Sequence, residues 1–133
     1  MLKDIHRPKV ENLAIAIVPP EDPTQELWEV FVLNLEEEPI HSVLIVSKGY
    51  GELDGEQRRT ATLRYFFEEI PALTVLKVEP IQPAVFELAN EYWVSYSFHN
   101  ELYDKKYVFV RGSIADPYFT LIPFLNRRGV MIR

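Results

Sequence analysis

Two nearly continuous apolar runs, separated by a short acidic turn, occupy residues 27–50 and constrain the fold more than any other part of the sequence. Residues 30–33 read Val-Phe-Val-Leu and residues 43–46 read Val-Leu-Ile-Val, so neither run has the polar alternation of a strand with one solvated face. Three glutamates at 36–38 must stay solvated, and a proline follows them. We therefore expect a hairpin of two central strands, each covered on both faces.

Five further segments carry strand patterns, at residues 13–18, 60–70, 73–79, 92–98 and 106–110. Residues 13–18 alternate bulky side chains with alanines, which predicts one bulky face and one face that another layer approaches closely. Residues 73–79 alternate apolar and charged side chains, which predicts a half-buried strand with Lys77 and Glu79 on its polar face.

The other segments are aromatic. Residues 92–98 have the cleanest two-residue period in the chain, with Trp93 on the same face as two serines, and residues 106–110 form the last expected strand. Residues 60–70 fit both a strand and a helical spacing, and their threonines and aromatics favour the strand. Residues 48–59 are expected to form a loop and residues 80–91 an irregular crossover.

Seven candidate strands within about 100 residues predict an all-β antiparallel sandwich. In architecture alone this order resembles an immunoglobulin-like or fibronectin-type sandwich, and the alternative is an α+β fold if residues 61–70 form a short helix. With 133 residues, 47% of them apolar, the chain can build a single domain spanning 1–133. Residues 1–9 are a polar lead-in.

Charge and composition exclude several classes of function. The net charge of -6 repels phosphate backbones and anionic lipid, which argues against nucleic-acid and membrane partners. The chain has no cysteine, so it has no disulfide, thiolate metal site or thiol nucleophile. The charged N-terminus lacks the apolar core of a signal peptide, and no apolar run reaches the roughly 18 residues of a membrane helix, which predicts a cytoplasmic protein.

No motif for catalysis, a metal or a cofactor is found. The glycines around Tyr50 lack the third glycine of the dinucleotide fingerprint, because Asp54 stands at that position. The three histidines are too far apart for metal spacing, and no serine lies in a nucleophile elbow. The sequence therefore predicts a non-enzymatic protein without metal or cofactor.

Three side chains are candidates for a small-ligand or carbohydrate site: Tyr50, Asp54 and Trp93. Tyr50 lies between two glycines, and Asp54 belongs to an alternating acidic stretch that is better explained as solvated loop acids than as a calcium site. For Trp93 we expect cover by a neighbouring loop, with a contact surface as the alternative.

The C-terminal residues 114–133 are apolar and basic. Of the sixteen residues from Tyr118 onward, nine are apolar and three are arginines, so these sixteen residues carry +3 against -9 for residues 1–117. Such a tail must be buried, either along its own domain or on a second copy in a homodimer. The residues expected to make this contact are Leu121, Ile122, Phe124, Leu125, Arg127, Arg128, Met131 and Ile132.

Together these features predict a non-enzymatic structural or protein-interaction module that self-associates through its tail. The alternative is a small-ligand or carbohydrate-binding module that uses loop aromatics and acids. A different partner protein could also bury the apolar side chains of the tail.

Overall fold

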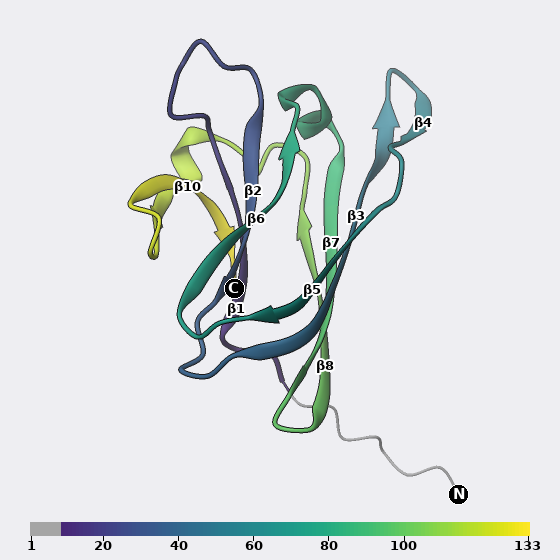
Figure 1. Ribbon diagram of the computed structural model, residues 1–133. Coiled ribbons are helices and arrows are strands. Elements are labelled where there is room, and N and C mark those ends of the chain that lie inside the picture. The colour runs from purple at the N-terminus through teal and green to yellow at the C-terminus, as the bar shows by residue number, and fades with distance from the viewer. Residues whose placement is uncertain (1–8) are drawn as a thin grey trace, which may run out of the picture.

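Ten strands and two short 3-10 helices make up the regular structure of the computed structural model, which describes residues 9–133 (Figure 1). The strands are β1 (Leu13–Val18), β2 (Trp28–Asn34), β3 (Ile40–Leu53), β4 (Glu56–Arg59), β5 (Leu63–Ile70), β6 (Thr74–Ile81), β7 (Ala89–Phe98), β8 (Glu101–Phe109), β9 (Thr120–Ile122) and β10 (Arg127–Ile132), and the helices are η1 (Pro83–Glu87) and η2 (Asp116–Tyr118). The predicted all-β sandwich is confirmed. The α+β alternative is wrong, because residues 63–70 form β5.

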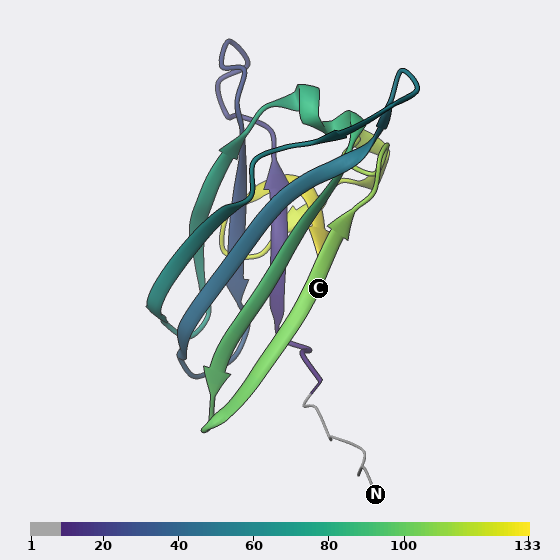
Figure 2. The ribbon, with the colours of Figure 1, turned by 90° about the vertical axis from the view of Figure 1, so that its right-hand side faces the viewer.

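Two five-stranded antiparallel sheets face each other across one apolar core. Sheet 1 has the order β6-β2-β1-β10-β9, and sheet 2 has the order β4-β3-β7-β8, with β5 pairing along another stretch of β3. Figure 2 looks onto sheet 2, with β5, β3, β7 and β8 side by side in front of sheet 1. The buried side chains between the sheets include Ile15, Val32, Ile45, Val94 and Phe109.

The predicted hairpin at residues 27–50 is wrong, because β2 and β3 lie in different sheets. β2 pairs with β1 and β6, whereas β3 pairs with β4, β5 and β7. The fully buried Asn34 stabilises the end of β2, where the chain leaves sheet 1 for sheet 2. The two N–H donors of its side-chain amide are shared among the carbonyl oxygens of Glu38, Ile70 and Pro71, which lie 3.0 to 3.2 Å from Nδ2. It thereby holds the β2–β3 connection against the β5–β6 connection, where the chain crosses between the sheets again.

Residues 48–59 form a hairpin and not the predicted loop. β3 continues to Leu53, and β4 returns beside it after a two-residue turn. Asp54 and Gly55 at this turn have φ angles of 54° and 78°, the left-handed backbone that Asp-Gly hairpin turns require. With β4, β9 and β10 added to the expected set, the described residues hold ten strands and not about seven.

The two strands expected to be covered on both faces differ. β2 is buried on both faces from Val30 to its end, as predicted. In β3 the inward Val43 and Ile45 are buried, but the outward Leu44 and Val46 are only half-buried. The prediction is wrong for β3, because the outer face of sheet 2 is open to solvent (Figure 2).

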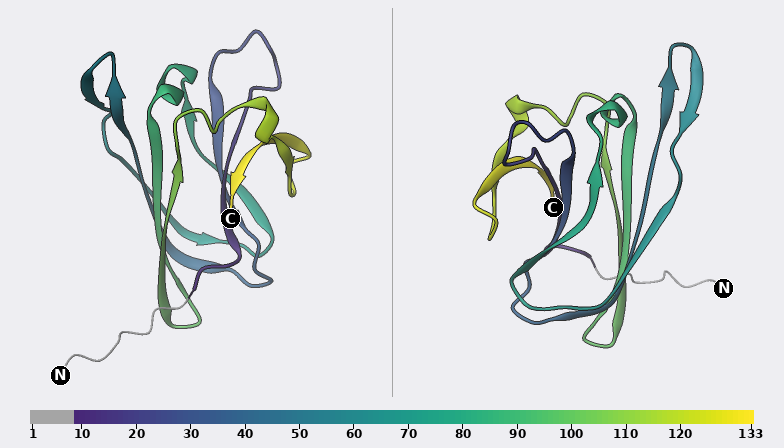
Figure 3. Two further views of the ribbon diagram at one scale, coloured as in Figure 1. Left: turned by 180° about the vertical axis from the view of Figure 1, so that it is seen from behind. Right: turned by 45° about the horizontal axis from the view of Figure 1, so that its top comes forward.

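The C-terminal residues 114–133 pack on their own domain. β10 pairs with β1, and the turn after β9 folds back over the outer face of sheet 1. Ile122 is buried there against Ala14, Ala16 and Leu33, so the alanine face of β1 receives a second layer, as predicted. Both views of Figure 3 show the yellow C-terminal end beside the purple N-terminal strand.

The predicted polar lead-in spans residues 1–9, and residues 1–8 of it lie outside the described part of the chain. From residue 9 onward, no helix has the length and apolar character needed to cross a membrane.

Candidate functional site

Four strands of sheet 2 present their outward side chains on one surface, here called the open face. Its cross-strand neighbours follow from the pairing of β3 with β5 and β7 and of β7 with β8. Two adjacent rows run across β5, β3, β7 and β8, namely Phe66, Leu44, Ser95 and Asp104, then Arg64, Val46, Trp93 and Lys106. Leu102 and Val108 lie beyond these rows on β8.

The centre of the open face is apolar. Phe66 is 64% exposed and Trp93 is 47% exposed, and the half-buried Leu44 and Val46 lie between them on β3. No described loop covers Trp93 to the extent expected from the sequence, so the alternative of a contact surface has the better support. Large apolar side chains that remain exposed together on a sheet are typical of interaction surfaces.

Charged side chains surround this centre. Arg64 and Lys106 lie in one row, and Asp104 lies in the next. Glu91 is buried beside them, where it accepts a hydrogen bond from the Tyr50 hydroxyl at 3.0 Å and has the Nζ of Lys48 at 3.7 Å. Burial, together with the hydrogen bond and charge of Glu91, raises the pKa of Tyr50.

The three side chains predicted to form a ligand site do not line a common pocket. Trp93 pairs with Val46, whereas Tyr50 lies four residues further along β3, about 13 Å at the usual strand rise. Asp54 is at the tip of the β3–β4 turn. A pocket of about 400 Å³ includes Tyr50 and Glu91 in its lining but neither of the other two candidates.

The predicted contact residues of the tail are divided between inside and outside. Ile122 is buried, Leu125 and Met131 are packed partly against the same cluster, and Ile132 packs against the main core, whereas Leu121 and Phe124 are exposed. The arginines bind their own chain. Arg127 Nη2 donates to Pro19 O at 2.7 Å and to Glu29 Oε1 at 2.9 Å, and its guanidinium lies over the Phe31 ring. Arg128 donates to Phe119 O at 3.1 Å.

A buried carboxylate that the sequence placed in solvent lies between the sheets. In β6, Lys77 pairs with Phe31 but Glu79 pairs with Val30, so Val78 is an extra residue that forms a β-bulge. The bulge reverses the alternation and turns Glu79 inward, where it is 8% exposed. The prediction of a polar-face Glu79 is therefore wrong. Pro80, next to the bulge, is the sequence signal that could have warned of it.

Three hydroxyl groups from sheet 2 bind this carboxylate. Ser47 and Tyr65 donate to Glu79 Oε1 at 3.0 and 2.6 Å, and Tyr92 donates to Oε2 at 2.8 Å. Burial, followed by the hydrogen bond and charge of Glu79, raises the pKa of Tyr65. Burial and then the charge of Glu79 raise the pKa of Tyr92. Both phenols therefore remain donors at neutral pH.

A pocket of about 240 Å³ opens beside this cluster and includes Glu79, Ser47 and Tyr92 in its lining. Asn90 and Gly49 also line it. The lining combines two charged residues, Glu79 and Lys48, with several hydrogen-bonding groups around a small partly apolar space, which is the composition typical of ligand sites.

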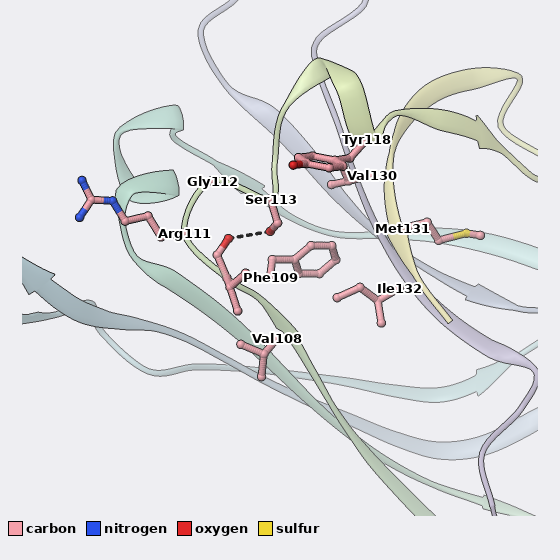
Figure 4. Close-up of a pocket in the computed structure, with 10 residues that line it drawn as sticks. Val108, Phe109, Arg111, Gly112, Ser113, Tyr118, Val130, Met131 and Ile132 are labelled. Carbon is pink, nitrogen blue, oxygen red and sulfur yellow. Dashed lines mark hydrogen bonds between the residues drawn. The ribbon is translucent and has the colours of Figure 1, made fainter.

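A further pocket, of about 650 Å³, lies between β8 and β10, where the edges of the two sheets part (Figure 4). Phe109, Val130 and Ile132 line it, and Arg111 points away from them and pairs with Glu87 at 3.0 Å. The Ser113 hydroxyl donates to the chain's own backbone. Polar side chains do not converge on this pocket, so it offers little to orient a ligand.

Comparison with known proteins finds no relative: no family description, no curated protein and no solved structure matches this chain. Its function therefore follows from its own surfaces, of which the open face and the Glu79 pocket gather the most side chains with binding chemistry.

Proposed function

We propose that this chain is a non-enzymatic interaction module that self-associates by packing the open faces of two copies together. The observation that carries the proposal is the exposure of Phe66 and Trp93, at 64% and 47%, in the middle of a sheet face. Aromatic side chains dominate the cores of protein interfaces because they bury a large area at a small cost in conformational entropy.

The open face is complementary to itself. A twofold axis parallel to the sheet and perpendicular to its strands, placed between the two central rows, lays each row over the other row of the second copy. Leu44 then lies over Val46, and Phe66 lies over Arg64, whose guanidinium can stack on an aromatic ring. Packed sheets keep their strands within about 30° of each other, so the central contacts survive the sheet twist.

The same axis pairs opposite charges on β8. Asp104 of one copy faces Lys106 of the other, and this contact occurs twice by symmetry. Further out on the strand, Leu102, which is 81% exposed, faces Val108. Complementary charges around an apolar centre fix the register of an interface more than they add affinity.

The alternatives expected from the sequence have weaker support. The tail residues make their contacts within one chain, although exchange of β9 and β10 between copies would reproduce those contacts. A carbohydrate site on Tyr50, Asp54 and Trp93 would need these side chains to converge. A cytoplasmic location stays a prediction from the sequence.

The test exchanges the two charges of β8 and measures the mass in solution by sedimentation equilibrium over a concentration series. The wild-type chain is expected to form a dimer. Asp104→Lys and Lys106→Asp should each be monomeric, because like charges then face each other across the axis. An equimolar mixture of the two variants should restore the dimer, because every new charge then faces an opposite one.

Arg58→Asp is the matched control for Lys106→Asp, since it makes the same charge change on β4, outside the open face, and should leave the mass unchanged. A wild-type chain that is monomeric at every concentration would reject self-association. A dimer that both charge variants retain would reject the open face and favour exchange of the tail.

A further inference from the structure

The inward orientation of the Glu79 side chain has the features of a binding site, in addition to any role in holding the two sheets together. Bulges re-aim side chains, and they are over-represented next to active sites. Without the extra residue at Val78, the carboxylate would lie beside Lys77 on the outer face of β6. The bulge instead places a charged group between the sheets, where a charge is costly unless it is compensated.

The described residues supply hydrogen bonds to the Glu79 carboxylate but no opposite charge. Within residues 9–133, no lysine, arginine or histidine forms an ion pair with Glu79. Lys48 lines the pocket, but its Nζ pairs with Glu91 at 3.7 Å. Its three partners are neutral hydroxyls, two on Oε1 and one on Oε2. A carboxylate has about four acceptor positions, so Oε2 can accept one more donor.

The other residues of the pocket restrict which kinds of ligand can supply that donor. The Asn90 amide nitrogen donates to the carbonyl oxygens of Val85 and Leu88, which turns its oxygen toward Gly49 and the pocket. Leu63, Ile81 and Val85 supply apolar lining. A divalent cation needs several oxygen ligands and here would find a single carboxylate. The volume of about 240 Å³ lies below the range of drug-sized ligands.

We propose that this pocket binds a protonated primary amine, with the ammonium group on Glu79 and a short aliphatic chain against Leu63, Ile81 and Val85. The ammonium group supplies the missing positive charge and has three donors, which Glu79 Oε2 and the Asn90 oxygen can accept. This site is independent of the open face, because it lies between the sheets and not on the outer surface of sheet 2.

A primary ammonium group reaches the pocket either on a small free amine or on a lysine side chain of a polypeptide. Two probes separate these sources: n-butylammonium chloride, and lysine with its α-amino group acetylated and its carboxyl group amidated. Tighter binding of the butylammonium probe assigns a free amine, and tighter binding of the blocked lysine assigns a polypeptide.

The experiment is a titration of the full chain followed by the amide signals in two-dimensional NMR. Saturable shifts are expected at pocket amides such as Ser47, Gly49 and Asn90, and 1-butanol, which has the same shape but no charge, should not cause them. Glu79→Gln should weaken the binding of the better probe at least about tenfold, since a hydrogen bond to an ionised group is lost. Glu52→Gln, which makes the same charge change on the exposed part of β3, is the control and should bind like the wild type.

A second variant keeps the test decisive if Glu79→Gln does not fold. Ala61 is exposed and lines the pocket, so Ala61→Phe should fill the mouth without touching the carboxylate and should abolish the shifts. The proposal is wrong if neither probe gives saturable shifts, if 1-butanol gives the same ones, or if binding persists in the folded Glu79→Gln or Ala61→Phe variant.

Discussion

The outer faces of both sheets carry apolar side chains, but these are buried on sheet 1 and exposed on sheet 2. On sheet 1, Ala14, Ala16 and Leu33 are buried because the chain's own C-terminal end folds over them. On sheet 2, the outward Phe66 and Trp93 have no such cover from residues 9–133. On β1 the covered side chains are small alanines, whereas on β5 and β7 the exposed side chains are the large aromatics Phe66 and Trp93.

This difference separates apolar surface that serves folding from apolar surface that is free to bind. Within sheet 1, β10 approaches β1 closely, since a Cβ at Gly129 would lie 2.5 Å from Ile17 O and 2.6 Å from Val18 Cγ1. The open face relies on long side chains that rise above the sheet. Substitutions on the two faces should therefore change the stability of the fold by different amounts.

Added bulk gives the largest contrast. Gly129→Val should destabilise the protein by about 3 kcal/mol, because its Cβ overlaps the β1 backbone and must push β10 away. Ser95→Val adds a similar side chain to the open face and should change stability by no more than about 0.5 kcal/mol. Urea unfolding monitored by circular dichroism measures both. Equal losses would mean that the open face is covered as well.

Removed bulk gives a smaller contrast of the same kind. Ile122→Ala should cost about 2 to 4 kcal/mol, because it leaves a cavity under the tail. Phe66→Ala should cost less than about 1 kcal/mol of monomer stability, because Phe66 leaves no cavity behind. The comparison is made by thermal unfolding at low protein concentration. A Phe66→Ala loss as large as that of Ile122→Ala would return Phe66 to a structural role.

The local sequence pattern predicted the structure correctly where the question was which side chains of one strand face the core. The alternation at 92–98 gave the correct faces, and the alanines of 13–18 correctly announced a close layer. The local pattern failed to predict which strands pair with each other. The apolar runs at 27–50 do not encode that β2 and β3 join different sheets, because this depends on the distant carbonyls that Asn34 binds.

The candidate site shows the same limit. Trp93 was identified from its position on a polar face, but its exposure depends on which segments cover sheet 2. The inward position of Glu79 was not predicted, because the bulged residue Val78 reverses the side-chain alternation. A prediction from a strict two-residue period does not include such a bulge. The Asp54-Gly55 turn, by contrast, has a signal in the sequence, because an Asp-Gly pair is typical of two-residue hairpin turns, and the prediction of a loop over residues 48–59 does not use that signal.

The smallest predicted effect concerns the charge that fastens the tail to the covered face. Burial opposes ionisation of Glu29, but the hydrogen bonds and charges of Arg127 and Lys77 outweigh it and lower the pKa of this carboxyl below 4.5. A lowered native pKa contributes stability that is present above the unfolded-state value and is lost as pH falls through the native value. Glu29→Gln should therefore lower Tm by about 2 °C at pH 7, and the difference from the wild type should vanish in acid.

Arg127→Gln removes the main partner of Glu29 and should weaken the same pH dependence. The double variant should lose no more of it than Glu29→Gln alone, since the two side chains share one interaction. Thermal unfolding at several pH values between neutrality and the acid range measures all three. A Glu29→Gln variant that keeps the full wild-type pH dependence would show that the tail is held by its apolar contacts at Ile122 and not by this ion pair.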